Sequence, residues 1–376
     1  MSRILLLNYE FPPLGGGASP LSYELARGFV QNGHSVTVVT MGYKTLPRYE
    51  EKDGMRIFRL RSVRAKKEIC TPWEQFTFII SAFFFFTNHL KKEKYDVNHT
   101  HFLIPSGIIS WWLKKKYQLP YVVTSHGSDV PGFNDDRFKL LHKFTGPILR
   151  LVSNNSDKII VPSKYLGTLI EKNINSALHS KIYYIPNGID EKKFVPQEKK
   201  KIILSTGRLL PRKGFQYLIN AMAKENLGYE LHIAGDGPMM TELQKLASNA
   251  KSKIVFHGWL DNLSHEYKEL LESAAIYSLV SPKENASVAL LEAMSAGCAI
   301  ITSSSGGAAE TMGEAGITIE AKNQTSINEA LRHLTTSSEE IQRLGQLARK
   351  RVLEKFSWTT VFHQYNQLFT PYGVKL

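Results

Sequence analysis

The chain has 376 residues, of which 43% are hydrophobic and 22% are charged. This length exceeds one ordinary hydrophobic core and suits two domains, and the composition excludes an intrinsically disordered protein. Two cysteines, Cys70 and Cys298, lie far apart in apolar contexts, which argues against a disulfide scaffold or a metal cluster and fits a reducing compartment. The first apolar run, Ile4–Leu7, is too short for the core of a signal peptide, so we expect a cytoplasmic protein.

Positive charge is concentrated in the first half of the chain. Residues 1–190 hold 25 Lys/Arg and 15 Asp/Glu, a net charge of +10, whereas residues 191–376 hold 22 and 19, a net charge of +3. Basic clusters occur at residues 64–67, 91–94 and 114–116. Such clusters are usually solvated helix ends; the functional interpretation is a surface that meets anionic lipid, peripherally at the inner face of the plasma membrane, or a phosphate-bearing acceptor. We expect no nucleic-acid partner, because no recognition motif is present.

Short apolar runs alternate with amphipathic patterns from end to end of the chain. The predicted strands are Ile4–Asn8, Ser35–Thr40, Ile57–Leu60, Val97–Thr100, Tyr121–Thr124, Lys158–Val161, Ile182–Ile185, Ile202–Thr206, Glu230–Ala234, Lys253–Phe256, Ile276–Val280, Ala299–Thr302 and Gly316–Ile319. The predicted helices between them include Leu21–Gln31, Phe215–Ala223, Met239–Ala250 and Glu266–Ser273. This alternation predicts an α/β fold with parallel sheets covered by helices on both faces. A turn cluster at 186–190, followed by a fresh strand, predicts a domain boundary near residue 190.

Residues 76–86 form the most apolar segment of the chain. The segment cannot be a transmembrane span, because a bilayer needs about 20 such residues. Polar residues flank it, Glu74 and Gln75 on one side and His89 and Lys91 on the other. The preferred interpretation is a buried helix, and the alternative is shallow insertion into a membrane surface beside the basic clusters.

Every informative motif of the chain follows a predicted strand, and ligands of open parallel sheets bind at the carboxyl ends of the strands. After the first strand, three glycines at 15–17 allow backbone amides to approach a ligand at a helix N-terminus, although a flexible loop would explain them equally well. Their spacing fits neither the dinucleotide fingerprint nor a Walker loop. After the strand at 121–124, His126 is placed to donate to a sugar hydroxyl or to a developing phosphate charge.

The second half of the chain carries a comparable series of loops. Arg208 and Lys213 follow the strand at 202–206 and are long enough to reach a pyrophosphate. Gly235 follows the next strand and is predicted to shape a tight turn beside the ligand. Gly258 and the ring of Trp259 follow the strand after that, where they could line a base pocket.

Two carboxylates, Glu284 and Glu292, lie eight residues apart in the sequence. If a helix starts near Ser287, Glu284 lies in the preceding loop and Glu292 lies one to two turns into the helix. A loop acid and a helix acid can hold two ends of one polar ligand, while the amides of Ser287, Val288 and Ala289 face an anion. The alternative is two unrelated surface glutamates.

Together, these motifs resemble those of glycosyltransferase family 4 in their order and spacing. They are the glycine loop, S-H-G at 125–127, G-R-x-x-x-x-K-G at 207–214, G-D-G-P at 235–238, E-x7-E at 284–292 and G-G-x-x-E at 306–310. The resemblance covers nearly the whole chain. It implies the GT-B architecture of two facing Rossmann-like domains: residues 1–190 on the acceptor side, residues 191–355 for the nucleotide-sugar, and residues 356–376 as a C-terminal helix that returns to the first domain.

The resemblance also implies roles for particular residues. Arg208 and Lys213 would bind the donor diphosphate, and Glu292 would bind the ribose hydroxyls. The catalytic positions would be Glu284, in contact with the transferred sugar, and His126, beside the anomeric centre. The remaining donor-binding positions would be Gly16, Gly17, Gly235, Gly258, Ser287, Val288 and Ala289.

The implied reaction is the retaining transfer of a hexose or N-acetylhexosamine from a nucleotide-sugar, UDP- rather than GDP-linked, to a polysaccharide, lipopolysaccharide or lipid-linked acceptor in bacterial surface glycan biosynthesis. The nucleotide-sugar is a substrate, and we expect no cofactor and no metal, because the two cations replace a metal ion. Ala286-Ser287 replaces the Phe-Gly of many members and Ala309 replaces a Pro, which leaves the donor sugar open. Residues 42–75 and 129–145 are expected to shape the acceptor site. The alternatives are an epimerase or phosphorylase on the same fold, or a non-catalytic nucleotide-sugar-binding protein.

Overall fold

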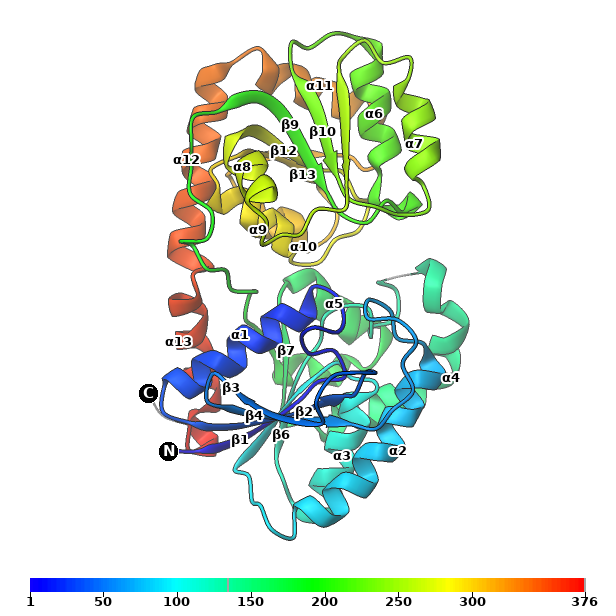
Figure 1. Ribbon diagram of the computed structural model, residues 1–376, viewed down its shortest axis with the longest axis vertical. Coiled ribbons are helices and arrows are strands. Elements are labelled where there is room, and N and C mark those ends of the chain that lie inside the picture. The colour runs from blue at the N-terminus through cyan, green and yellow to red at the C-terminus, as the bar shows by residue number, and fades with distance from the viewer. Residues whose placement is uncertain (134, 375–376) are drawn as a thin grey trace. The chain divides into compact units, whose positions relative to one another are not determined.

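The computed structural model describes residues 1–133 and 135–374, without the side chains of residues 135–143. Within the range expected to shape the acceptor site, residue 134 and those side chains therefore lie outside the described residues. The chain divides into two compact units, Met1–Pro186 with Phe362–Leu376, and Asn187–Val361 (Figure 1). Each unit is an α/β fold with helices on both faces of its sheet, as predicted.

The first unit is built on an eight-stranded sheet with the order β3-β4-β2-β1-β5-β6-β7-β8. The strands are β1 (Arg3–Leu7), β2 (Ser35–Met41), β3 (Tyr49–Lys52), β4 (Met55–Leu60), β5 (Val97–His101), β6 (Tyr121–Thr124), β7 (Lys158–Val161) and β8 (Ile182–Tyr184). Neighbouring strands pair in parallel except β3 and β4, which form an antiparallel hairpin. The strand order reverses between β1 and β5, so the loops that follow these two strands border the crevice where such sheets bind ligands.

Strand β3 was not among the predicted strands. Its residues, Tyr49–Lys52, are mostly charged and exposed, so they carry no apolar alternation. The turn to β4 consists of Asp53 and Gly54, which have φ angles of 49° and 75°. An Asp-Gly pair between two strands is a strong sequence signal for a hairpin, because both positions of such a turn require positive φ. This pair could have predicted the edge strand β3.

The helices of the first unit lie on both faces of the sheet. They are α1 (Ala18–Gln31), α2 (Pro72–His89), α3 (Ser106–Tyr117), α4 (Asp135–Asn155), α5 (Lys164–Asn173) and the end of α13 (Trp358–Phe369). Phe78 and Phe86 of α2 and Ile109 of α3 pack in one cluster with alternate residues of β1. On the other face, the ring of Phe29 in α1 meets the ring of Phe369 in α13 at 5.5 Å.

The predicted buried helix at 76–86 is confirmed for only one of its faces. Helix α2 buries Phe78, Ala82 and Phe86, but Phe76, Ile80 and Phe84 are exposed. The interpretation of the whole segment as buried core is therefore wrong, because only one stripe of the helix faces the sheet. No helix within the described residues is long and apolar enough to cross a membrane.

The second unit contains a six-stranded parallel sheet with the order β11-β10-β9-β12-β13-β14. The strands are β9 (Lys200–Thr206), β10 (Glu230–Ala234), β11 (Ile254–Gly258), β12 (Ala274–Leu279), β13 (Ala299–Ser303) and β14 (Gly316–Ile319). The helices are α6 (Phe215–Lys224), α7 (Met240–Ala247), α8 (His265–Ser273), α9 (Val288–Ser295), α10 (Gly307–Met312), α11 (Gln324–Thr335) and α12 (Ser338–Lys355). Because the order reverses between β9 and β12, the loops after these strands border the crevice of this sheet.

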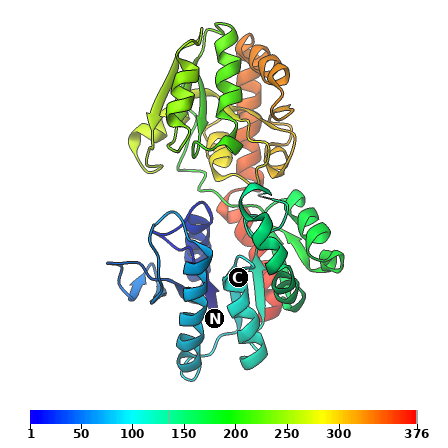
Figure 2. The same cartoon turned by 90° about the vertical axis from the view of Figure 1, so that its right-hand side faces the viewer.

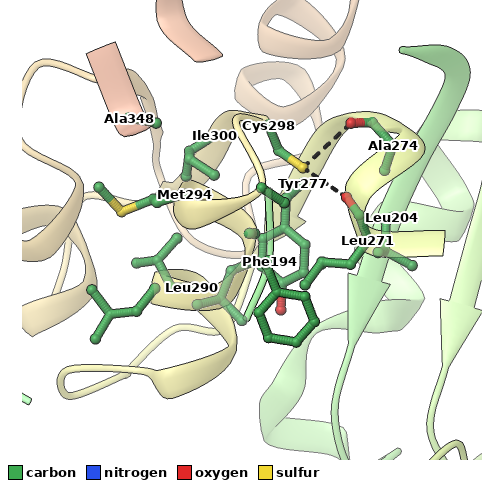
Figure 3. Close-up of a cluster of buried hydrophobic side chains, with 14 of the residues drawn as sticks. Phe194, Leu204, Leu271, Ala274, Tyr277, Leu290, Met294, Cys298, Ile300 and Ala348 are labelled. Atoms are coloured by element: carbon green, nitrogen blue, oxygen red, sulfur yellow. Dashed lines mark hydrogen bonds between the residues drawn. The ribbon is translucent and has the colours of Figure 1, made fainter. Parts of the chain in front are cut away.

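Helix α9 is held by a buried cluster on one face of the second sheet. Leu290 and Met294 of α9 pack there with Phe194, Tyr277 and other apolar side chains (Figure 3). The thiol of Cys298 lies in the same cluster and donates to the carbonyl oxygens of Leu271 and Ala274 at 3.4 and 3.3 Å (Figure 3). This packing fixes the direction in which the N-terminus of α9 points.

The C-terminal segment 356–376, predicted as a returning helix, begins in the second unit. There the amide of Trp358 donates to the carbonyl oxygen of Ile189 at 3.2 Å. From Phe362 onward, α13 belongs to the first unit. Gly28 of α1 is required there, because a Cβ at this position would lie 1.7 Å from the ring of Phe362. Residues 375 and 376 lie outside the described residues.

Candidate active site

The loop after β9 carries the two predicted phosphate-binding cations. Arg208 is exposed, and Lys213 ends a short 3-10 turn, Pro211–Lys213. The next residue, Gly214, has a φ of +80° and leaves no room for a side chain, because a Cβ would lie 2.7 Å from the carbonyl oxygen of Val280. The hydroxyl of Ser281 also donates to the carbonyl oxygen of Lys213 at 3.2 Å. The Lys213 loop is therefore fastened to the segment that follows the neighbouring strand, β12.

Lys213 and Glu284 form an ion pair at the switch point of the sheet. Their side chains are 21% and 12% exposed, so solvent screens the pair only partly. The backbone of Glu284 is fixed from the other side, because its carbonyl oxygen accepts from the amide of Gly307 at 2.8 Å. Gly306 makes this approach possible: its φ is +97°, and a Cβ there would lie 2.4 Å from the same oxygen. The G-G pair at 306–307 thus positions the first acid of the E-x7-E motif.

Helix α9 begins as the sequence predicts, with Ser287 as its N-cap. The Ser287 hydroxyl accepts from the amide of Leu290 at 3.4 Å. The amides of Val288 and Ala289 belong to the first turn, whose N–H groups have no acceptor within the helix. The carbonyl oxygen of Ala286, just before the cap, accepts from Asn187 Nδ2 at 2.7 Å. The positive end of the α9 dipole therefore lies three residues after Glu284 along the chain.

Glu292 lies just over one turn into α9 and is buried, with 5% of its surface exposed. Its Oε2 accepts from the Tyr267 hydroxyl at 2.9 Å, and its Oε1 lies 3.7 Å from Lys193 Nζ. Burial raises the pKa of Glu292, and Lys193 and the Tyr267 hydroxyl oppose that shift. The carboxylate is therefore held in one orientation by a phenol and an ammonium. Sequence reasoning missed both partners, since neither stands in a motif.

The glycines that follow β9 and β10 and the glycine that ends β11 are joined by backbone hydrogen bonds. The amide of Gly235 donates to the carbonyl oxygen of Gly258 at 2.7 Å, and the amide of Gly207 donates to that of Ala234 at 3.0 Å. A Cβ at Gly235 would lie 1.9 Å from the Gly207 carbonyl oxygen. Gly258 has a φ of +69°, with no atom within 4 Å of an added Cβ. Trp259, considered for the base pocket, is 72% exposed.

The glycine loop of the first unit follows β1 and precedes α1. The amide of Gly15 donates to the carbonyl oxygen of Lys67 at 2.8 Å, and the amide of Gly16 donates to Glu10 Oε2 at 3.2 Å. Gly16 and Gly17 are exposed, and a Cβ at either would meet no atom within 4 Å. The loop therefore exposes backbone where the resemblance implies it, but Glu10 brings a carboxylate to the Gly16 amide.

His126 follows β6 in a loop that one buried carboxylate organises. Asp129 Oδ1 accepts from the hydroxyl of Ser125 at 3.0 Å and from the amides of His126 and Gly127 at 3.3 and 3.1 Å. Asp129 Oδ2 accepts from the amide of Leu103 at 2.8 Å. Burial raises the pKa of Asp129, and these donors oppose that shift. The loop is thus tied to the segment after β5.

The imidazole of His126 is paired with a second histidine that sequence reasoning missed. His126 Nε2 lies 3.0 Å from His101 Nδ1, and the two rings stack at 5.2 Å. Burial lowers the pKa of His126 to about 4, and burial also lowers the pKa of His101 well below 6.5. Both rings are therefore neutral at pH 7. The contact with His101 therefore fixes how the His126 ring is oriented in its loop.

The predicted site residues form two groups, one in each unit. Arg208, Lys213, Glu284 and the start of α9 gather at the switch point of the second sheet, with Glu292 deeper in α9. His126 and the glycine loop follow strands of the first sheet. Across the described residues, no group of three or more His, Cys, Asp or Glu side chains is arranged to hold a metal ion.

Comparison with known proteins agrees with this arrangement. Residues 15–193 match the sequence profile of Glycosyltransferase Family 4, and residues 187–351 match that of Glycosyl transferases group 1. An uncharacterized glycosyltransferase of Methanocaldococcus jannaschii is 31% identical over 78% of each chain. The N-acetyl-alpha-D-glucosaminyl L-malate synthase of Bacillus anthracis is 24% identical over 95% of this chain and 94% of its own.

Solved structures show the same fold. The sucrose-phosphate synthase of Thermosynechococcus elongatus has a TM-score of 0.82 at 22% identity and matches 99% of both chains. HepE of Anabaena, solved with UDP, has a TM-score of 0.76 at 15% identity over 99% of this chain and 100% of its own. The architecture is therefore GT-B. The two sequence profiles and the Methanocaldococcus jannaschii relative establish that the chain is a glycosyltransferase and belongs to glycosyltransferase family 4.

Proposed function

We propose that the chain transfers a hexose or N-acetylhexosamine from a nucleoside diphosphate-sugar, UDP- rather than GDP-linked, to a glycan or lipid-linked acceptor of the bacterial surface, with retention of the anomeric configuration. The observation that carries the proposal is the Lys213–Glu284 ion pair at the switch point of the second sheet, three residues before the N-cap of α9. A cation, a carboxylate and a helix N-terminus gathered there suit the two halves of a sugar diphosphate.

The charge requirements of the reaction fit this arrangement. Breaking the sugar–phosphate bond builds negative charge on the leaving diphosphate and positive charge on the sugar. Lys213, Arg208 and the amides of Val288 and Ala289 would stabilise the diphosphate, the task that a metal ion performs in other transferases. Removing one preorganised group of this kind costs about 3–4 kcal/mol in the barrier. We therefore propose metal-independent transfer.

The acids would serve the other parts of the donor. Without donor, Glu284 pairs with Lys213, which holds the ammonium in place. Diphosphate oxygens would compete for that ammonium, and the carboxylate would then accept from hydroxyls of the transferred sugar. Glu292, held by Tyr267 and Lys193, would accept from the ribose hydroxyls.

The names of relatives support this substrate class. Relatives include a UDP-Gal:alpha-D-GlcNAc-diphosphoundecaprenol alpha-1,3-galactosyltransferase of Escherichia coli, which is 29% identical over 55% of this chain. Another is an alpha-monoglucosyldiacylglycerol synthase of Streptococcus pneumoniae, 24% identical over 78% of this chain. The first name gives a lipid-linked acceptor and the second a glycolipid product. The sugars in the two names differ, so the donor sugar must be found by assay.

A donor screen tests the proposal. The chain is incubated with labelled UDP-glucose, UDP-GlcNAc, UDP-galactose and GDP-mannose, with and without lipid-linked acceptors, and free nucleotide and glycosylated product are measured. We expect nucleotide release with one UDP-sugar, a product with retained configuration, and loss of both in Lys213→Met but not in Lys245→Met, an exposed lysine of α7. Binding without release would identify a sensor instead, and an isomerised donor sugar would identify an epimerase.

A further inference from the structure

Helix α2 presents aromatic and aliphatic side chains to solvent. Trp73, Phe76, Ile80 and Phe84 recur at helical spacing on one side of the helix and are 66%, 49%, 40% and 74% exposed. The other exposed positions of the helix are Pro72 and Asn88, so none of its exposed positions carries a charge. An exposed apolar stripe of this kind marks an interaction surface.

The stripe lies on a well-anchored helix. The Thr71 hydroxyl accepts from the amide of Glu74 at 3.4 Å, and Glu74 Oε2 accepts from the amide of Thr71 at 2.6 Å, which together form a capping box. Glu74 Oε1 also accepts from the amide of Ala65 at 2.7 Å. Phe78 and Phe86 fix the opposite face in the core. The exposed side chains therefore do not result from an unpacked segment.

A second apolar stripe lies on α4, where Phe144, Ile148 and Leu151 are 74%, 38% and 40% exposed. Helix α3 packs against both α2 and α4. Figure 2 looks onto this group of helices from the right-hand side of Figure 1. The two stripes thus belong to one helical layer on a single face of the first sheet.

Exposed cations precede and follow α2 along the chain and end α3. Arg61, Lys66 and Lys67 are exposed in the segment before α2, and that segment is fastened to the helix because the amide of Val63 donates to the Thr77 hydroxyl at 3.0 Å. Exposed cations also follow α2, at Lys91 and Lys92, and end α3, at Lys115 and Lys116. The net charge of +10 in residues 1–190 has the same sign.

We propose that α2 and α4 form a docking surface for an anionic lipid bilayer. Helix α2 is about 27 Å long at a rise of about 1.5 Å per residue, and it would lie in the plane of the interface with Trp73, Phe76, Ile80 and Phe84 among the acyl chains. The flanking lysines would meet lipid phosphates. Apolar and aromatic side chains on one face, with cations at the margins, are typical of helices that lie on membranes. The surface goes beyond the proposed transfer reaction and does not depend on it.

Vesicle co-sedimentation of the full chain tests the surface. Wild type, Trp73→Ser/Phe76→Ser/Phe84→Ser and a matched control, Leu263→Ser/Leu353→Ser, are mixed with neutral phosphatidylcholine vesicles or with vesicles containing phosphatidylglycerol, at low and high salt. Leu263 and Leu353 are exposed apolar residues of the second unit, 78% and 45% exposed. We expect wild type and control to bind anionic vesicles at low salt, and the triple variant to bind about a hundredfold more weakly.

Further measurements separate the alternatives. Circular dichroism and thermal unfolding of the triple variant should match wild type, because the replaced side chains are exposed. Donor turnover in detergent solution, without vesicles, should also be unchanged, so the docking surface and the proposed reaction fail independently. The inference is overturned if wild type binds no vesicle at low salt, if it binds neutral and anionic vesicles equally, or if sedimentation velocity shows that the same side chains hold two copies of the chain together.

Discussion

Tyr267→Phe removes the hydroxyl that donates to Glu292, the carboxylate that we assign to the donor ribose. The hydroxyl donates to Glu292 Oε2 at 2.9 Å, and the two residues are only 6% and 5% exposed. A hydrogen bond to a buried charged group contributes about 1.5–3 kcal/mol. Its loss should therefore weaken UDP binding about 10- to 100-fold. Because the phenol opposes the burial that raises the pKa of Glu292, its removal should raise this pKa further.

Isothermal titration with UDP measures the loss, and Tyr277→Phe is the matched control. Tyr277 is also buried, and its hydroxyl bonds to Thr206 Oγ1 at 2.9 Å rather than to Glu292. The control should lose comparable stability but change UDP affinity less than about threefold. In turnover assays Tyr267→Phe should raise KM and leave kcat nearly unchanged, the pattern for an interaction made equally in ground and transition states. Equal UDP affinities of the two variants would refute the role of Tyr267 in positioning Glu292.

Three further outcomes follow from the structure. Burial lowers the pKa of His99 to about 3, of His126 to about 4 and of His101 well below 6.5, so the unfolded state binds more protons below pH 6.5. These three histidines should together lower the free energy of unfolding by about 4 kcal/mol between pH 7.5 and pH 5.5. Urea titrations of wild type and His101→Gln at both pH values measure this contribution, and the fall should be about 1.4 kcal/mol smaller in the variant. An equal fall in both proteins would contradict it. Gly235→Ala should lower the free energy of unfolding by about 3 kcal/mol and lower the midpoint of thermal unfolding, because the added Cβ would lie 1.9 Å from the Gly207 carbonyl oxygen. An unchanged midpoint would contradict this close packing of Gly235 against Gly207. Turnover should be unchanged by EDTA, and a loss that Mg²⁺ or Mn²⁺ restores would contradict metal-independent transfer.

The elements of the core were predictable because burial imposes a pattern on the sequence. Parallel strands covered on both faces, such as β6 and β10, are short apolar runs, and their predicted bounds match the structure. Strand β3 has no such pattern, because it lies at the sheet edge and is exposed on most of its length. The burial of helix α2 was overestimated for the opposite reason. Its apolar residues lie on both faces and suggested a buried helix, but only one stripe packs against the sheet, and the sequence does not show which one.

The sequence predicted those parts of the candidate site in which the spacing of a motif sets where each residue lies along one loop and helix. The E-x7-E spacing places Glu284 before α9 and Glu292 within it, as the structure has them. The residues that orient these groups come from elsewhere: Tyr267 from α8 and Lys193 from the segment before β9. His101 reaches His126 from a different strand, β5. Such pairs depend on strand order, which a single sequence does not reveal, so they were missed.

The most direct test concerns charge neutralisation of the leaving diphosphate by Lys213. Single-turnover transfer from the donor found by the screen is measured for wild type, Lys213→Met and Lys245→Met, each at saturating donor. We predict that Lys213→Met transfers sugar about 100- to 1,000-fold more slowly, while Lys245→Met matches wild type. A Lys213→Met rate within about threefold of wild type would contradict the claim that this ammonium stabilises the departing diphosphate.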